Sequence, residues 1–352
     1  MPLARFIKYP LIFKKPAGTS RGVLHEKESW FLILNDPSQP QRLGIGECSV
    51  IPGLSLDDRN EIESVLKSVC EALNHGTSGP ELHFFPAVRF ALETAILDFD
   101  MGGQQYLYPS GFTEAEQGIP INGLIWMGDK SGMLDQVAQK IDQGFSVLKL
   151  KVGALDFEDE ISIVEAIRDE HPASELDIRL DANGAWREGE AIGKLERLSS
   201  LHIHSVEQPI RPGEFEEMAE VCRISPIPIA LDEELITILS KESREKLIDT
   251  VQPHYIIIKP SLLGGIEQSR EWISIAGSRN VQWWITSALE SNIGLNAIAQ
   301  WTATLDTKLP QGLGTGSLFT NNIPSPLEIR GEKLYHLNDK PWDLSGLKGG
   351  AI

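Results

Sequence analysis

A repeating pattern of short apolar runs and amphipathic stretches begins after Ile119 and constrains the fold more than any other feature of the chain. Each run is rich in β-branched or apolar residues, and the next stretch has apolar positions at helical spacing, as in βα units. The predicted strands are IPINGLIW, SVLKLKVG, DIRLDANG, HSVEQPI, PIALDEE, YIIIKPSLLGG, QWWITSALE and a short one near LPQGLG. Eight strands favour an α/β fold with a closed parallel (β/α)7β barrel, a modified TIM barrel.

The residues before this repeat follow a different pattern. Between Arg5 and Gly46 the apolar runs are short and broken by proline and glycine, with a strong strand at residues 30–34. Apolar positions then recur at helical spacing in residues 60–74 and 85–101. We therefore expect a β-meander followed by two helices, which together form an N-terminal α+β domain.

The change of pattern divides the chain into three predicted parts. Its 352 residues are too many for one ordinary domain but suit a barrel of about 250 residues with a second domain. We expect the α+β domain to span residues 1–116 and the barrel to span residues 117–318. The last part, residues 319–352, lacks a strong helical pattern and is expected to return to the first domain.

Composition argues against several classes of partner. The formal charge of −18, from 32 Lys plus Arg against 50 Asp plus Glu, would repel a nucleic acid backbone. The apolar start of the chain is broken by Arg5, Lys8 and Pro10 before it reaches signal-peptide or membrane length. We expect a small-molecule substrate and no nucleic acid or membrane partner, and the oligomeric state stays open.

The cysteines indicate the compartment. Their number is odd, they lie far apart, and they have no CxxC spacing. They are Cys48, Cys70 and Cys222. Neither a disulfide framework nor a structural zinc site is indicated, and a reducing cytoplasm fits this pattern best.

Three acids and two lysines stand at the carboxyl ends of successive predicted strands. They are Lys151, Asp181, Glu207, Asp232 and Lys259. The intervals between them are 30, 26, 25 and 27 residues, each close to the length of one βα unit. Because active sites of such barrels lie at the carboxyl ends of the strands, we expect the five side chains to surround the barrel mouth.

Alternation along the strands predicts which side chains point into the barrel. In VLKLKVG, Lys149 and Lys151 share the face opposite to the leucines. In DIRLDAN, Arg179, Asp181 and Asn183 likewise share one face. If the apolar faces meet the helices, the charged faces converge inside, where they must compensate one another or a cation.

Three carboxylates from adjacent strands form an all-oxygen site that suits Mg²⁺, with Mn²⁺ as a possible substitute. A lysine beside such a site can remove a proton next to a carboxylate if its pKa is lowered from about 10.4 by neighbouring positive charge. Lys149 and the metal are the expected sources of that charge. Lys149 is therefore a candidate catalytic residue together with Lys151 and Lys259.

Each of these residues taken alone has an ordinary structural explanation. An aspartate before Asn-Gly, such as Asp181, is commonly a turn or cap residue. A lysine before proline, such as Lys259, is commonly an exposed residue at a strand end. Five such residues at the same end of five strands favour a site over five separate structural roles.

The motifs LKLKVG, LDANGAW, VEQPI, ALDEE and IIKPSLLGG resemble the muconate-lactonising subgroup of the enolase superfamily over nearly the whole chain. The resemblance implies that Lys151, the second lysine of the KxK motif, is a base and that Lys259 is the opposite catalytic lysine. It implies the metal ligands Asp181, Glu207 and Asp232. A lysine base working with Mg²⁺ is the general arrangement in that superfamily.

The same resemblance implies that the first domain caps the barrel. Mobile loops near residues 15–21 and 47–55 would close over the substrate. Such closure would exclude water from an enediolate.

Within the superfamily, GECSVIPGLS, AVRFALETAILDFD, SALESNIGL and PQGLGTGSLF are most similar to the o-succinylbenzoate synthase family. This similarity implies a hydro-lyase of menaquinone biosynthesis that dehydrates 2-succinyl-6-hydroxy-2,4-cyclohexadiene-1-carboxylate to 2-succinylbenzoate. It implies that Lys151 takes the proton and then helps the hydroxyl leave as water. Lys259 would mainly stabilise the enediolate.

Two alternatives remain. An N-acylamino acid racemase or dipeptide epimerase of the same subgroup could use the two lysines to exchange a proton on both faces. Dipeptide epimerases usually carry an Asp-x-Asp motif after the last barrel strand, where this chain has GLGTGSLF, and the mandelate-racemase-like branch has a histidine where this chain has QWWITSALE. A barrel that keeps the metal site only for binding is disfavoured, because two buried lysines would be costly there.

Overall fold

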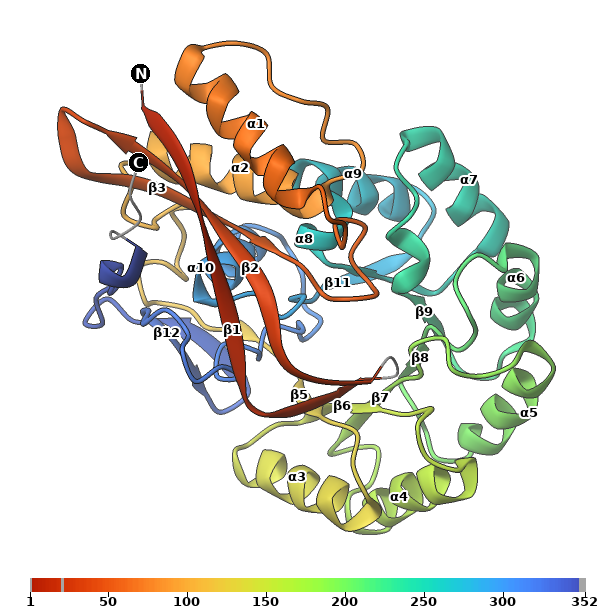
Figure 1. The fold of residues 1–352 in the computed structure, drawn as a ribbon. Helices are drawn as coiled ribbons and strands as arrows, with labels where there is room; N and C mark the ends of the chain where they lie inside the picture. The colour runs from red at the N-terminus through yellow and green to blue at the C-terminus, as the bar shows by residue number, and fades with distance from the viewer. Residues whose placement is uncertain (1, 20–21, 348–352) are drawn as a thin grey trace.

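The computed structural model describes residues 2–19 and 22–347 and consists of a parallel barrel with a long antiparallel sheet lying across it (Figure 1). The antiparallel sheet has the order β1-β2-β3. Its strands are β1 (Leu3–Thr19), β2 (Gly22–Asp36) and β3 (Gln39–Ser49), followed by the helices α1 (Ile62–His75) and α2 (Pro86–Asp100). The predicted α+β domain of strands followed by two helices is therefore present.

The strands of this sheet are longer than the short runs that the sequence predicts. Pro10 and Pro16 both lie within β1, which is an edge strand of the sheet. Proline cannot donate a ladder hydrogen bond, but an edge strand tolerates it where no partner lies beside it. The pairing register of β1 and β2 shifts between Ile12 and Ala17, where Pro16 interrupts the ladder without ending the strand.

Helix α2 packs directly on the backbone of β3 because two glycines leave room for it. A Cβ added to Gly44 would lie 2.3 Å from the carbonyl oxygen of Ala95. A Cβ added to Gly46 would lie 2.0 Å from the carbonyl oxygen of Ala91. This close contact fixes α2 against the sheet.

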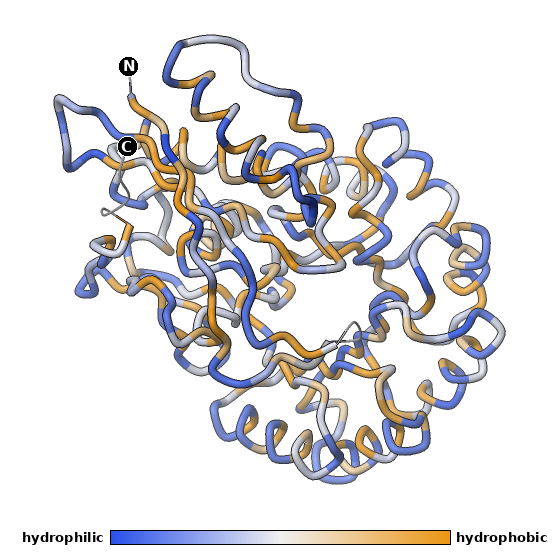
Figure 2. The backbone as a smooth tube through the Cα atoms, viewed as in Figure 1, coloured by the Kyte–Doolittle hydropathy of each residue, from blue (hydrophilic) through white to orange (hydrophobic). Residues whose placement is uncertain are grey.

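The barrel is built on a parallel sheet in the strand order β11-β10-β9-β8-β7-β6-β5. The strands are β5 (Gly123–Ile125), β6 (Val147–Lys151), β7 (Asp177–Asp181), β8 (Ser205–Glu207), β9 (Ile229–Leu231), β10 (Tyr255–Ile258) and β11 (Gln282–Ile285). The helices are α3 (Lys130–Asp142), α4 (Phe157–Glu170), α5 (Glu188–Ser199), α6 (Phe215–Ile224), α7 (Lys241–Val251), α8 (Pro260–Leu263), α9 (Ile266–Gly277) and α10 (Asn292–Thr302), with a short 3-10 helix at Glu233–Leu235. Hydrophobic and hydrophilic residues alternate along the outer helices, as expected for helices with one face on the sheet (Figure 2).

The predicted eighth strand closes the barrel but is reduced to two residues. Gln311 forms a parallel bridge with Ile121, and Gly312 forms one with Thr286. Pro310 precedes them and has no N–H to extend the ladder. The predicted (β/α)7β barrel with an α+β domain is confirmed, with the eighth strand shortened for this reason.

The first predicted barrel strand is divided into two elements. β4 (Ile119–Pro120) pairs with β13 (Lys333–His336), which in turn pairs with β12 (Leu327–Arg330), and only β5 continues into the barrel. The C-terminal segment therefore pairs with β4, which lies directly before the first barrel strand. It also contacts the antiparallel sheet, where Arg5 Nη2 donates to the carbonyl oxygen of Leu347 at 2.8 Å. The division at residues 116 and 318 remains our proposal.

Within residues 2–19 and 22–347, every helix is too short or too polar to cross a membrane.

We predict that Gly46→Ala lowers the free energy of unfolding by roughly 3 kcal/mol, because its Cβ would overlap the backbone of α2. Gly193→Ala is the matched control, since Gly193 lies in α5 and an added Cβ there meets nothing within 4 Å. That control should be stabilised by roughly 0.5–1 kcal/mol. Chemical denaturation of both variants measures these changes, and equal effects at the two positions would contradict the packing argument.

Candidate active site

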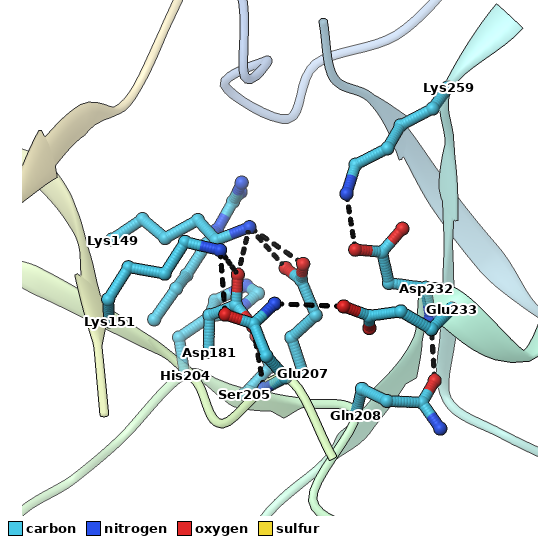
Figure 3. Close-up of polar contacts among 12 residues, drawn as sticks. Lys149, Lys151, Asp181, His204, Ser205, Glu207, Gln208, Asp232, Glu233 and Lys259 are labelled. Atoms are coloured by element: carbon cyan, nitrogen blue, oxygen red, sulfur yellow. Dashed lines mark hydrogen bonds and ion pairs between the residues drawn. The ribbon is translucent and has the colours of Figure 1, made fainter. Parts of the chain in front are cut away.

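The five residues predicted from their spacing lie together at the carboxyl ends of the barrel strands (Figure 3). Lys151, Asp181 and Glu207 are the last residues of β6, β7 and β8. They are register neighbours, since Lys151 pairs with Asp181 and Asp181 pairs with Glu207. Asp232 and Lys259 directly follow β9 and β10. One residue per strand therefore reaches the same end of the barrel.

The lysines bind the carboxylates from two sides. Lys149 Nζ lies 2.8 Å from Asp181 Oδ2 and 2.7 Å from Glu207 Oε2. Lys151 Nζ donates to Asp181 Oδ2 at 2.7 Å and to Asn183 Oδ1 at 2.9 Å. Lys259 pairs with Asp232 on the other side of the carboxylates, as Figure 3 shows.

The carboxylates of this site are almost fully buried and outnumber the lysines. Asp181, Glu207, Asp232 and Glu233 are 0–4% exposed, and they face the three ammonium groups of Lys149, Lys151 and Lys259. Arg179 lies on the same face of β7, but it stacks on Trp284 at 4.2 Å and donates to the carbonyl oxygen of Pro310. Burial, and then Asp181, raise the pKa of Glu207 well above its ordinary value. The site therefore favours additional positive charge.

Neighbouring carboxylates raise the pKa values of two of the lysines. Burial alone would lower the pKa of Lys149, but Asp181 and Glu207 outweigh it and raise that pKa. Burial is likewise outweighed at Lys259, where Asp232 and Glu207 raise the pKa. The carboxylates paired with these two ammonium groups therefore outweigh burial. The expected lowering of a catalytic lysine's pKa by Lys149 and a bound metal stays a prediction.

The residues fit a hard divalent cation by their chemistry. Within the residues that the structure describes, no group of three acidic, histidine or cysteine side chains is close enough to hold a metal ion. Lys149, Lys151 and Lys259 each pair with at least one of the carboxylates of Asp181, Glu207 and Asp232. Glu207 Oε2 nevertheless accepts no well-directed hydrogen bond, although Lys149 Nζ lies 2.7 Å away. Three buried carboxylates from adjacent strands with spare acceptor capacity form a donor set of the kind that Mg²⁺ prefers.

Other buried side chains fix the backbone around the site. Gln208 Oε1 accepts the backbone N–H of Asp232 at 3.1 Å and so joins the ends of β8 and β9. Glu160 accepts the backbone N–H of Gly153 at 2.5 Å and holds the loop that follows Lys151. These contacts hold the backbone that follows β6, β8 and β9 around the site.

A cavity of about 370 Å³ opens above these groups. Its polar floor is formed by Lys149, Lys151, Asn183, Glu233 and Lys259. Its walls are largely apolar and include Leu24, Ile51, Leu54, Trp126 and Leu289. Leu24 belongs to β2, and Ile51 and Leu54 belong to the loop after β3, so the N-terminal domain closes one side of the cavity.

Of the two segments expected to be loops over the substrate, one is mostly strand and the other lines the cavity after its strand ends. The loop expected near residues 15–21 is strand up to Thr19, and Ser20 and Arg21 lie outside the described residues. The loop expected at residues 47–55 is strand up to Ser49, and its remainder lines the cavity through Ile51 to Leu54.

Several cavity residues were not assigned a role from the sequence. Alternation in DIRLDAN places Asn183 on the inner face, and that signal could have identified it as a partner of Lys151. Glu233 is the second acid of ALDEE, and neither strand alternation nor its spacing from the other charged residues marks it as a cavity residue. The apolar wall residues Leu24 and Trp126 cannot be distinguished from core residues without the fold.

The segment GLGTGSLF forms part of the cavity wall. Gly314 and Thr315 line the cavity, and this segment has no acid. Gly312 also lines it, and a Cβ there would lie 2.5 Å from Thr286 Oγ1, so this position excludes a side chain. The cavity therefore lacks an acidic group from this segment that could bind a substrate ammonium.

A family model, a curated relative and a solved structure all match this chain over most of its length. The family model "Enolase C-terminal domain-like" matches residues 132–341. An o-succinylbenzoate synthase from Desulfotalea psychrophila (strain LSv54 / DSM 12343) is 46% identical, over 91% of this chain and 95% of its own length. The crystal structure of MenC from Desulfotalea psychrophila LSv54 superposes with a TM-score of 0.85 at 41% identity, covering 95% of this chain and 99% of that one.

A more distant relative is an N-succinylamino acid racemase from Amycolatopsis sp, which is 25% identical over 94% of this chain and 90% of its own length. The family match covers more than half of the chain, and the synthase match covers nearly all of it. The chain therefore belongs to the enolase superfamily and, within it, to the o-succinylbenzoate synthase family.

Proposed function

We propose that this protein is a Mg²⁺-dependent o-succinylbenzoate synthase, which removes water from 2-succinyl-6-hydroxy-2,4-cyclohexadiene-1-carboxylate to give 2-succinylbenzoate in menaquinone biosynthesis. The observation that carries the proposal is the placement of Lys151 and Lys259 on opposite sides of three buried carboxylates. The 46% identity to an o-succinylbenzoate synthase selects this reaction among those that such a site could perform.

Asp181, Glu207 and Asp232 are the residues that would hold Mg²⁺. When bound there, the ion would supply positive charge to the substrate carboxylate and so favour loss of the neighbouring proton. Lys151 and Lys259, which pair with Asp181 and Asp232, also line the cavity and would be in reach of the substrate.

Lys151 is the proposed base and acid of the dehydration. Its neutral amine would take the proton from the carbon next to the ring carboxylate. The resulting ammonium would return that proton to the hydroxyl group, whose C–O bond breaks to release water. Asn183 Oδ1 accepts from Lys151 Nζ at 2.9 Å and orients this group toward the cavity. One lysine can perform both steps when the proton and the hydroxyl leave from the same face.

Lys259 is proposed to remain charged. It lies across the site from Lys151 and would stabilise the negative charge that develops on the substrate when the proton leaves. Lys149, between Asp181 and Glu207, would hold those carboxylates in place and add positive charge near Lys151.

The cavity suits a small carboxylate with an apolar ring. Its volume of about 370 Å³ is within the range for small-molecule sites, and its apolar walls would surround the cyclohexadiene ring. Leu24 and Leu54 from the N-terminal domain would exclude water from the reacting carbons.

The second candidate is a racemase of N-acylated amino acids. The observation that favours it is the same pair of opposed lysines, since racemisation needs a proton-exchanging group on each face of the substrate. The lack of an acid in GLGTGSLF disfavours a dipeptide epimerase, whose substrate carries an ammonium group.

The three cysteines bear on the proposed location of the protein. Cys48, Cys70 and Cys222 are buried and free, which supports the proposed reducing cytoplasm.

The proposed reaction is tested with the purified protein and Mg²⁺ on two substrates, the cyclohexadiene and an N-succinyl amino acid in deuterated water. We expect rapid conversion of the cyclohexadiene to 2-succinylbenzoate. Chelation should abolish this activity without unfolding the barrel, Mg²⁺ should restore it, and Zn²⁺ should restore it poorly. Efficient racemisation with no dehydration would replace the synthase by the racemase. Full activity after exhaustive chelation, checked by metal analysis, would exclude the metal-dependent mechanism.

We predict that the two lysines respond differently to substitution. Lys151→Ala should lower kcat for dehydration by roughly 10⁴-fold or more, because one group serves as both base and acid. Lys259→Ala should also be severe, whereas Lys259→Arg should keep measurable dehydration, since a fixed positive charge still stabilises the developing negative charge. A racemase would lose all racemisation in Lys259→Arg. Dehydration that is unaffected in Lys151→Ala would show that the base has been misassigned.

A further inference from the structure

Two motifs that the mechanism does not use, GECS at residues 46–49 and SALES at residues 287–291, meet in one buried polar network. The network joins the antiparallel sheet to the barrel. Its charged members are Lys27, Glu47 and Glu290, whose side chains are 0–1% exposed. Three buried charged groups outside the reaction centre call for a functional explanation, because apolar residues could fill the same space at lower cost.

The part of the network in the sheet orients Glu47. Lys27 Nζ donates to Ser49 Oγ at 2.6 Å and to Ser29 Oγ at 3.1 Å. Ser29 Oγ in turn donates to Glu47 Oε1 at 2.9 Å. Lys27 and Ser29 lie on β2, and Glu47 and Ser49 lie on β3, so two strands of the sheet hold one carboxylate toward the barrel.

Glu47 then binds the start of α10 in the barrel. Its carboxylate accepts the N–H of Ser291 at 2.9 Å, the hydroxyl of Ser291 at 2.6 Å and the N–H of Gly294 at 3.0 Å. The amino end of a helix favours a carboxylate because its first N–H groups lack partners within the helix. The N-terminal domain therefore supplies the carboxylate that caps α10.

Glu290 connects this junction to the active site. One oxygen accepts the N–H of Ala288 at 2.7 Å, and the other accepts the hydroxyl of Ser261. Ser261 lies two residues after Lys259 in the short helix α8. Ala288 lines the cavity. Glu290 thus ties the segment that carries Lys259 to the cavity wall formed by the loop after β11.

The backbone of this loop is held in an unusual conformation. Leu289, which lines the cavity, has φ of 61°, a left-handed conformation that leucine seldom adopts. The bond from Ala288 to Glu290 lies on one side of it, and the bond from Ser291 to Glu47 lies on the other. Strained residues of this kind persist where surrounding contacts fix them, and they are common at functional sites.

We propose that Glu290, supported by Lys27 and Glu47, is a positioning residue that holds Lys259 through Ser261 and holds Leu289 through Ala288. Docking of the N-terminal domain on the barrel then sets the geometry of the Lys259 side of the cavity. Lys151 lies on the opposite side and is reached by none of these bonds. This inference rests on the proposed role of Lys259 in the dehydration.

The test is Ser261→Ala. This substitution removes the hydrogen bond from Ser261 to Glu290, and with it the proposed connection to Lys259, with little change of side-chain volume. The matched control is Ser269→Ala, because Ser269 is equally buried in α9 but its hydroxyl donates only to the carbonyl oxygen of Gly265 at 2.8 Å. Both substitutions are made in the wild-type protein and in Lys259→Ala. Turnover of the cyclohexadiene with Mg²⁺ gives kcat and KM, and thermal unfolding reports stability.

We expect Ser261→Ala to lower kcat about tenfold with KM changed less than twofold, as for loss of a hydrogen bond to a charged group. In Lys259→Ala the same substitution should change kcat less than twofold, because the ammonium group that Ser261 positions is absent. Ser269→Ala should change kcat less than twofold in both backgrounds. An equal loss of kcat from Ser261→Ala in both backgrounds, or no loss in either, would overturn the proposal.

Glu290→Gln provides a second arm that keeps the shape of the side chain and one acceptor oxygen. It should lower kcat at least as much as Ser261→Ala, and the double variant should be no worse than Glu290→Gln alone. Losses that simply multiply would also overturn the proposal. If the wild-type protein does not dehydrate the cyclohexadiene, the proposed function is refuted. This result is obtained before any variant is measured, so it is distinct from failure of the positioning proposal.

Discussion

The pairing of buried lysines with buried carboxylates at the ends of the barrel strands is the constraint on which the rest of this structure depends. Charged groups removed from water are tolerated only when they are paired and hydrogen-bonded. Lys149, Lys151 and Lys259 each contact a carboxylate, and the carboxylates still exceed the ammonium groups by one when Glu233 is counted. The protein therefore holds a site in which buried carboxylates outnumber the ammonium groups that pair with them.

The barrel and the N-terminal domain contribute different parts of this site. The barrel places one charged residue at the end of each strand from β6 to β8, and two more directly after β9 and β10. The N-terminal domain supplies apolar wall residues such as Leu24 and Leu54, and it is joined to the barrel through Glu47 at the start of α10. Low dielectric surroundings strengthen every charge interaction in the cavity, so the position of this domain affects the chemistry as well as the access of substrate.

The sequence predicts the barrel and its charged residues well, because a βα repeat brings one residue per unit to the same end of the strands. Alternation within β6 also places Lys149 correctly beside Lys151. The sequence does not predict the direction of the lysine pKa shifts, since that direction depends on which carboxylate each ammonium group meets. Nor does it predict the link from Ser261 to Glu290 or the wall residue Leu24, because these contacts join segments far apart in the chain.

The most direct test of the central claim is a calorimetric titration of Mg²⁺ into the wild-type protein and into Asp181→Asn, Glu207→Gln and Asp232→Asn. We predict one saturable site per chain in the wild type and at least about tenfold weaker binding in each variant, because each substitution removes one charged ligand oxygen. Glu160→Gln, a buried acid outside the three carboxylates, should bind Mg²⁺ as the wild type does. Equal Mg²⁺ affinity in the wild type and all three carboxylate variants would contradict the claim that these residues form the metal site.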